Sequence, residues 1–212
     1  VKKALEEGKD VITSNKDLIA EKGEELGQIA DEHGATLNFE ASVAGGIPII
    51  RTLKESLAGN KLDKITSILN GTTNFILSKM YNEDMSFNSA LKAAQIHGFT
   101  ETDPTSDING YDAARKLSIL TRLAFEKSLP WRRVGIQGIS AIDKRDIQFA
   151  KDLKYKIKLV ATSICKDDVL YATVQPVFVH RSSVIGKIDN EYNTIVLNGD
   201  AVGEIVFSGK GA

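Results

Sequence analysis

The chain has 212 residues, 42% of them hydrophobic, and its 27 lysines and arginines nearly balance its 28 aspartates and glutamates. This composition is that of an ordinary soluble globular protein, and the formal net charge of -1 argues against general attraction to nucleic acid or to an anionic membrane. The sequence holds one cysteine, Cys165, and no apolar run of the roughly 20 residues that a membrane-spanning helix needs, so we expect a cytoplasmic protein without a disulfide framework.

Helices and strands alternate in the first part of the chain. The pattern predicts a helix that ends at Gly8, a strand over residues 10–13, a helix over 17–33 and a strand-like run over 35–42. Such alternation favours parallel pairing of strands in an α/β sheet.

The middle of the chain is expected to be mainly helical and the last third to be rich in strands. The later helices are predicted over residues 49–58, from 73 onward, and over 86–96, 112–126 and 143–153. A strand over residues 64–69 should end in a turn at Asn70 and Gly71. Three more strands are expected in YKIKLVATSIC, VLYATVQPVFV and NTIVLNG, the last of which leads into AVGEIVFSGKGA. The helix over residues 112–126 carries a stripe that should face the core, formed by Ala113, Leu117, Leu120 and Ala124.

The stretch ETDPTSDINGYDAARK concentrates acidic residues before and within a predicted helix. Asp112 and Lys116 stand four residues apart and so share one face of that helix. As a surface ion pair they would contribute only about 0–1 kcal/mol. Because Glu101, Asp103 and Asp107 precede them, however, we expect the lysine to face a concave acidic wall. A lysine held in this way can exchange a proton during a reaction, and the wall suits the ammonium group of an amino-acid substrate.

The segment EASVAGGIPII places Glu40 before a glycine-rich bend. One interpretation is a simple turn in which glycine supplies a positive φ. The other is a cation site, in which turn carbonyls and the carboxylate offer hard oxygen ligands to a monovalent or larger divalent ion. Lys16 follows a predicted strand at the start of a helix, which is the usual ligand edge of an α/β sheet, although lysines at such positions are commonly solvated.

Other reactive residue types offer weaker candidates. Cys165 lies in an apolar strand-like run, and we interpret it as a core cysteine. His33, His97 and His180 are scattered without metal-ligand spacing and are expected to be solvent-facing or structural. The sequence contains no G-x-G-x-x-G pattern.

Four segments together carry a family resemblance: SNKDLIA, EASVAGGIPII, ILNGTTNFIL and GFTETDPTSDINGYDAARKLSIL. In this order and spacing they resemble homoserine dehydrogenase over nearly the whole chain. The resemblance implies an oxidoreductase that interconverts L-homoserine and L-aspartate 4-semialdehyde, with NADP or NAD as cofactor. This reaction belongs to the biosynthesis of threonine, methionine and isoleucine.

The resemblance also implies roles for individual residues. Lys116 would be the proton donor, and Asp112, Glu101 and the Gly98 backbone would hold the amino and hydroxyl groups of the substrate. Lys16 would stand between the nicotinamide and the substrate. A sodium ion would be bound by the carboxylate of Glu40 and by the backbone carbonyls of Val43, Gly45 and Ile47.

The fold that the resemblance implies is α/β, with two parts. Residues 1–37 would be the C-terminal part of a Rossmann-like nucleotide-binding domain. Residues 38–212 would be an α+β substrate-binding and dimerisation domain with a mixed β-sheet covered by helices, and we expect a homodimer formed through that sheet. Because the family's N-terminal phosphate loop is absent from the sequence, the chain resembles a fragment, which we expect to be inactive by itself.

Two alternatives stay open at this point. A semialdehyde dehydrogenase that acylates a cysteine would need a reactive cysteine in a polar cleft, whereas Cys165 is expected to be buried. A non-catalytic amino-acid-binding or assembly module would keep the substrate pocket after losing the cofactor half. Homoserine binding without turnover would favour this second alternative.

Overall fold

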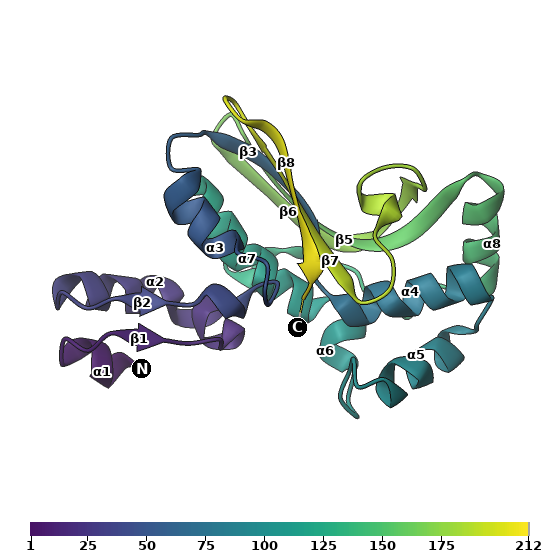
Figure 1. Cartoon of the computed structure of the whole chain (residues 1–212), viewed down its shortest axis with the longest axis horizontal. Coiled ribbons are helices and arrows are strands. Elements are labelled where there is room, and N and C mark those ends of the chain that lie inside the picture. Colours follow the sequence, from purple (N-terminus) through teal and green to yellow (C-terminus); the bar gives the residue numbers. More distant parts are fainter. Residues whose placement is uncertain (212) are drawn as a thin grey trace.

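The computed structural model describes residues 1–211, and its N-terminal segment forms a small unit beside the main sheet (Figure 1). The unit consists of α1 (Lys2–Glu6), β1 (Val11–Ile12), α2 (Lys16–Glu32) and β2 (Leu37–Asn38). β1 and β2 pair in parallel, as the alternation predicts. The helix α2 starts after Asn15, whose side chain accepts a hydrogen bond from the Leu18 amide at 3.0 Å. The expected strand over residues 35–42 is confirmed only in β2, because a 3₁₀ turn at Glu40–Ser42 follows.

The main sheet has six strands in the order β4-β6-β5-β3-β7-β8. In chain order the strands are β3 (Leu62–Ile68), β4 (Gly135–Ile136), β5 (Tyr155–Lys166), β6 (Val169–His180), β7 (Tyr192–Gly199) and β8 (Gly203–Lys210). The fold is therefore the expected α/β type with a mixed sheet, but parallel pairing within this sheet is restricted to β4 and β6. The reason is local: β5 and β6 form a hairpin whose turn residues Asp167 and Asp168 both have positive φ, and β7 and β8 form another.

The predicted helices begin and end close to their expected positions, with two exceptions, and α6 lies where an acidic loop was expected. The elements are α3 (Ile49–Arg51), α4 (Gly71–Glu83), α5 (Phe87–Ile96), α6 (Thr105–Ile108), α7 (Tyr111–Phe125) and α8 (Lys144–Asp152). The helix expected over residues 49–58 is wrong in its second half, because α3 passes into a π-helical turn at Thr52–Ser56. The turn expected at Asn70 and Gly71 is also wrong. Asn70 instead caps α4, accepting a hydrogen bond from the Thr73 amide at 2.8 Å, so the helix starts earlier than expected.

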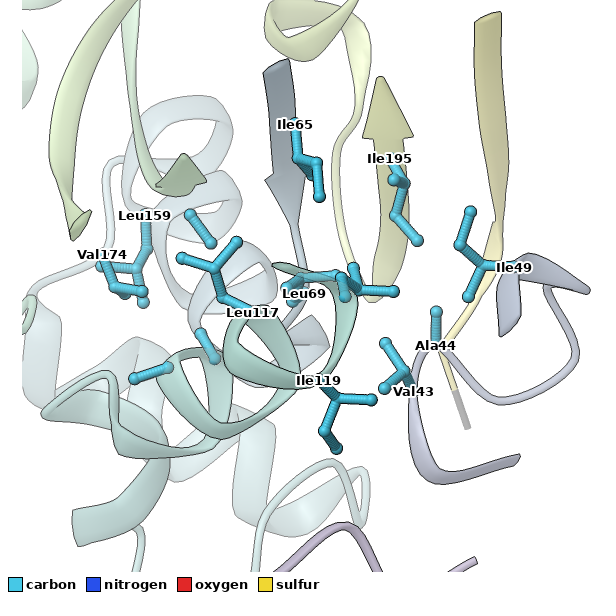
Figure 2. Close-up of a cluster of buried hydrophobic side chains, with 14 of the residues drawn as sticks. Val43, Ala44, Ile49, Ile65, Leu69, Leu117, Ile119, Leu159, Val174 and Ile195 are labelled. Carbon is cyan, nitrogen blue, oxygen red and sulfur yellow. The ribbon is translucent and has the colours of Figure 1, made fainter. Parts of the chain in front are cut away.

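The core lies between the sheet and α7. Figure 2 shows Leu117 of α7 beside Leu69, the residue that follows β3, and Ile119 of α7 and Leu159 of β5 belong to the same core cluster. Burying this apolar surface is the main stabilising contribution to such a fold. The predicted stripe on α7 is confirmed at Ala113, Leu117 and Leu120, which are buried, whereas Ala124 is half-buried. Cys165 is half-buried rather than in the core. The three histidines are exposed, as expected.

The helix α4 takes the place of a strand beside half of β5. β3 pairs with β5 only through residues 161–164 of β5, so the first half of β5 has no strand on that side. α4 follows β3 in the chain and contacts β5 there. The side chain of Lys158 in the first half of β5 can therefore reach α4.

The start of α4 also packs closely against the chain that leads into β7. A Cβ atom placed on Gly71 would lie only 2.7 Å from the backbone oxygen of Glu191. Glycine is thus required at this position because a backbone atom, and not a flexible side chain, fills the space. Within residues 1–211, no helix combines the length and the apolar composition that crossing a membrane demands.

We predict that Gly71→Ala destabilises the protein, because the new methyl group must displace the Glu191 carbonyl. Overpacking of this kind costs about 1–3 kcal/mol. The matched control is Gly27→Ala in the middle of α2, where an added Cβ meets nothing within 4 Å. This control should gain about 0.5–1 kcal/mol from the reduced flexibility of the unfolded chain. Urea denaturation measures both variants, and equal stabilities of the two would contradict the close approach.

Candidate functional site

A polar pocket of about 310 Å³ lies where the start of α4, the helix α7 and the strand β7 meet. Its lining comes from distant parts of the sequence and includes Gly211. The lining residues are Asn70, Gly71, Thr72, Gly98, Phe99, Asp107, Asp112, Lys116, Glu191, Asn193 and Gly211. Such a concave site with a few convergent polar groups is the usual form of a small-molecule site.

Asp112 is the charged centre of this pocket and is only 5% exposed. Its Oδ2 atom lies 2.8 Å from Nζ of Lys116, and its Oδ1 atom lies 3.5 Å from Nζ of Lys16. Burial by itself would raise the pKa of Asp112, but Lys116, the Asn70 amide and Lys16 outweigh burial and hold the pKa below its ordinary value of 3.8. The carboxylate therefore stays charged at neutral pH.

Lys116 is held by two acceptors and keeps one side toward the pocket. Besides the carboxylate of Asp112, its ammonium donates to the backbone oxygen of Leu69 at 3.0 Å. An ammonium carries three N–H groups, so one donor is left for a molecule bound in the pocket. The side chain of Lys116 is 15% exposed, so the charge is oriented rather than freely solvated.

Asn70 joins two of the acidic residues that line the pocket, Asp107 and Asp112. Its amide nitrogen donates to Oδ2 of Asp112 at 2.9 Å and to Oδ1 of Asp107 at 2.7 Å. Its amide oxygen caps α4, so the orientation of the side chain is determined at both ends. The second oxygen of Asp107 accepts a hydrogen bond from Thr100 at 2.9 Å. The sequence predicts Asn70 only as a turn residue, so its contact with both carboxylates is a feature that tertiary structure alone reveals.

The structure brings together part of the acidic wall expected around Lys116. Asp107 and Asp112 line the pocket, and so does Gly98, which adopts a left-handed conformation with φ of 73°. Glu101 is exposed and lies outside the set of residues that line the pocket. Asp103 is also exposed and accepts hydrogen bonds from Thr105 instead. Of the three acidic residues expected before the pair and Asp112 itself, only Asp107 and Asp112 thus line the pocket.

Two further pocket residues, Glu191 and Asn193, were missed by sequence reasoning. Asn193 is buried in β7, and its amide nitrogen donates at 3.3 Å to the same Leu69 oxygen that accepts from Lys116. Its own side-chain oxygen has no hydrogen-bond partner among the described residues. The only available signal was one asparagine at a strand position among apolar residues, and such residues also occur on exposed strands.

The bend after Glu40 offers oxygen atoms but already uses some of them. The two carboxylate oxygens of Glu40 accept hydrogen bonds from the backbone amides of Ile50 at 2.9 Å and Arg51 at 2.8 Å. Ala44 and Gly45 both have positive φ, which bends the chain sharply. Figure 2 shows the apolar side chains of Val43 and Ala44 directed into the core, which anchors the bend.

The free acceptors of this bend are compatible with a hard cation. No hydrogen bond from the described residues reaches the carbonyl oxygens of Val43 or Gly45. The carbonyl oxygen of Ile47, in contrast, accepts from the Ile49 amide at 2.8 Å. A carboxylate oxygen keeps a second lone pair after accepting one hydrogen bond. Glu40 and the two free carbonyls could therefore still ligate an ion such as sodium. Within residues 1–211, His, Cys, Asp and Glu form no cluster of three or more side chains suited to a metal.

Comparison with known proteins places these features in a family. The family model for homoserine dehydrogenase matches residues 48–212. Homoserine dehydrogenase of Bacillus subtilis is 46% identical over 209 residues, which are 99% of this chain and 48% of that protein. The crystal structure of a homoserine dehydrogenase from Thiobacillus denitrificans is 40% identical with a TM-score of 0.96, and the match covers all of this chain and 49% of that one.

A second similar structure is that of a complex with NADPH. A hyperthermophilic archaeal homoserine dehydrogenase mutant in complex with NADPH is 31% identical with a TM-score of 0.84, and the match covers all of this chain and 61% of that one. This chain spans about half the length of the curated relatives that it matches.

We predict that Asp112 makes the stability of the protein depend on pH in the acid range. Because its pKa is lower in the folded protein than the ordinary 3.8, its contribution is present above that value and is lost as the pH falls below it. Asp112→Asn should therefore flatten the dependence of the free energy of unfolding on pH between about 5 and 2. The measurement is urea denaturation across that range. As the control, Asp63→Asn changes an exposed carboxylate of β3 that lies outside the pocket, and identical pH profiles for both variants would contradict the prediction.

Proposed function

The chain belongs to the homoserine dehydrogenase family, and we therefore propose that the protein that carries it interconverts L-homoserine and L-aspartate 4-semialdehyde with NADPH or NADH. The observation that carries this proposal is the pocket in which Lys116 lies between the buried carboxylate of Asp112 and the Leu69 carbonyl, with Lys16 at 3.5 Å from the same carboxylate. This arrangement supplies a fixed proton donor next to groups that bind an amino acid.

Reduction of the aldehyde requires a hydride on its carbon and a proton on its oxygen. Bound NADPH or NADH would supply the hydride. Lys116 donates the proton to the developing alkoxide through the N–H that the protein leaves free, and takes a proton back in the reverse reaction. Asp112 keeps the ammonium oriented and compensates its charge. Because the Leu69 oxygen accepts a second N–H, the direction of the third is determined.

Three residues are assigned to the amino and hydroxyl groups of the substrate. Asp112 and the backbone of Gly98 line the pocket, and Glu101 lies on the adjacent loop, where its carboxylate is exposed. Carboxylates suit the substrate's ammonium group because a hydrogen bond between charged partners is stronger than one between neutral groups. Lys16, at the N-terminus of α2, is assigned to the boundary between the nicotinamide and the substrate.

The two-part organisation of the chain supports different functions for its two parts. The parallel pair of β1 and β2 with α1 and α2 is separate from the six-stranded sheet. We assign residues 1–37 to the nucleotide-binding domain and residues 38–212 to the substrate-binding and dimerisation domain, of which Ala212 lies outside the described residues. The family model begins at residue 48, within the second part.

A homodimer formed through the sheet is supported by apolar residues on its open face. Val206 pairs with Val196, and Tyr171 pairs with Ile164, so these pairs share a face of the sheet. Val206 and Tyr171 are exposed there. Covering such residues with a second copy would remove apolar area from water.

The single cysteine is the sequence feature that supports a cytoplasmic location.

We predict that Lys116→Met lowers turnover of L-homoserine by at least about 10²-fold, the scale of a lost general acid. The assay follows NADP or NAD reduction by the protein that carries this chain. Lys92→Met is the matched control, since Lys92 is exposed on α5 outside the pocket, and it should retain wild-type turnover. Near-normal turnover of Lys116→Met would show that the lysine has no catalytic role. Binding of homoserine without turnover by the wild type would favour the non-catalytic module instead.

We predict a sodium ion in the bend after Glu40, with Ile47 contributing through the second lone pair of its carbonyl oxygen. A high-resolution crystal structure should show a peak about 2.3–2.6 Å from the oxygens of Glu40, Val43 and Gly45. Soaking in thallium should replace this peak with an anomalous one, and Glu40→Gln should weaken it. A peak at water-like distances, surrounded by hydrogen-bond donors, would contradict the assignment.

A further inference from the structure

Lys158 is the largest fully buried polar side chain in the described part of the molecule, and it lies outside the pocket. It stands in the first half of β5 and is 1% exposed. Burial lowers the pKa of its ammonium to about 8, against the opposing effect of Asp189, so the group is charged at pH 7. A buried charge is costly, and replacing such a charge by an apolar group is often neutral or stabilising. Stability alone is thus a weak reason for a lysine here.

The ammonium of Lys158 connects two separate segments, the helix α4 and the stretch that leads into β7. On α4 it donates to Oδ1 of Asn74 at 2.8 Å and to Oγ of Ser78 at 3.4 Å. On the segment that leads into β7 it donates to the backbone oxygen of Ile188 at 2.6 Å and to Oδ1 of Asp189 at 2.9 Å. The lysine reaches both because α4 occupies the side of β5 where no strand pairs.

The same two segments are also bonded directly to each other. The Asn74 amide donates to the backbone oxygens of Ile188 at 3.3 Å and Tyr192 at 3.1 Å. The backbone amide of Asn190, a residue with φ of 57°, donates to Oγ of Ser78 at 3.0 Å. Lys158 is therefore the centre of a hydrogen-bond network, which we call the α4–β7 junction: Asn74, Ser78, Lys158 and residues 188–192. Lys156 faces this junction from β5 and binds the other oxygen of Asp189 at 2.6 Å.

Both segments continue from the junction directly into the pocket. One turn before Asn74, the start of α4 supplies Asn70, Gly71 and Thr72 to the pocket lining. The other segment supplies Glu191 and Asn193. The spacing of these two walls depends on how closely the segments are held together, and Gly71 already allows contact with the Glu191 backbone.

We propose that Lys158 is a positioning residue for the substrate pocket, which holds residues 188–193 against α4 so that Glu191 and Asn193 stand opposite Asn70 and Lys116. The inference rests on the proposed function for the identity of the substrate. It assigns no contact between Lys158 and the substrate. Loss of the ammonium leaves the acceptors on both segments without their common donor, so the second wall is less restrained and the substrate binds less tightly.

The test is Lys158→Met at pH 7 in the protein that carries this chain. Methionine keeps most of the length of the side chain and removes all of its donors. The first measurement is amide hydrogen exchange without substrate, in which residues 188–193 should exchange at least about tenfold faster while the β5–β6 hairpin is unchanged. The second is steady-state kinetics, in which KM for L-homoserine should rise about tenfold, equivalent to about 1.4 kcal/mol, while kcat changes less than about threefold.

The matched control is Lys151→Met. Lys151 pairs with Asp84 just beyond the opposite end of α4, so it tests the loss of a lysine that braces the same helix away from the pocket. This control should leave exchange in residues 188–193 and KM unchanged. If Lys158→Met does not fold, Asp189→Asn tests the same junction with Lys158 retained, and it should give smaller changes in the same direction.

The two proposals fail in different ways. Wild-type exchange rates in residues 188–193 of the folded variant, or a wild-type KM, would overturn the positioning role. Absence of homoserine turnover in the wild type would instead count against the proposed function, while hydrogen exchange would still decide whether Lys158 holds the segment. An equal increase of exchange in the Lys151 control would also overturn the inference, because the effect would then belong to α4 as a whole.

Discussion

The charge of Asp112 is the constraint on which the site depends. A carboxylate that is 5% exposed needs partners, since an unpaired charge in such a position is strongly unfavourable. Its partners come from three places: Lys116 from the same helix, Asn70 from the start of α4, and Lys16 from the N-terminal unit. Satisfying this one group therefore determines how α7, α4 and α2 lie relative to one another. The pocket lies beside this group, where the start of α4 and the helix α7 meet β7.

The helix α4 connects this group to a second polar network. At its first turn Asn70 caps the helix and joins Asp107 to Asp112. One turn further on, Asn74 and Ser78 bind the segment before β7. The second network is anchored by a buried cation, whereas the first is anchored by a buried anion. Residues at the start of α4 and further along it take part in the two networks, so this helix links them.

The sequence predicted the elements better than it predicted their pairing. Periodicity and caps gave α2, α5, α7 and α8 almost to the residue, because those signals are local. All strands but β4 were predicted, and both the parallel pair of β1 with β2 and the mixed character of the main sheet agree with expectation. The order of the strands in that sheet was not predicted, because pairing depends on which strands follow one another as hairpins.

The site shows the same limit. The pair Asp112 and Lys116 was recognisable because a helix brings residues four apart together. Asn70, Glu191 and Asn193 were not, since only tertiary structure brings them to the pocket.

The arrangement of β3 has a consequence for how the chain acquires its structure. Its partner on β5 is distant in sequence, with Ser67 bonded to Ala161 across 94 residues, whereas β5 and β6 are joined by a tight turn. Contacts that close long loops form late and slow folding, and local hairpins form early. During synthesis on the ribosome, β3 therefore has no strand to pair with until the later hairpins have emerged. Its apolar residues are not buried against those strands in the meantime. A strand that is unpaired during synthesis adds to the risk of aggregation.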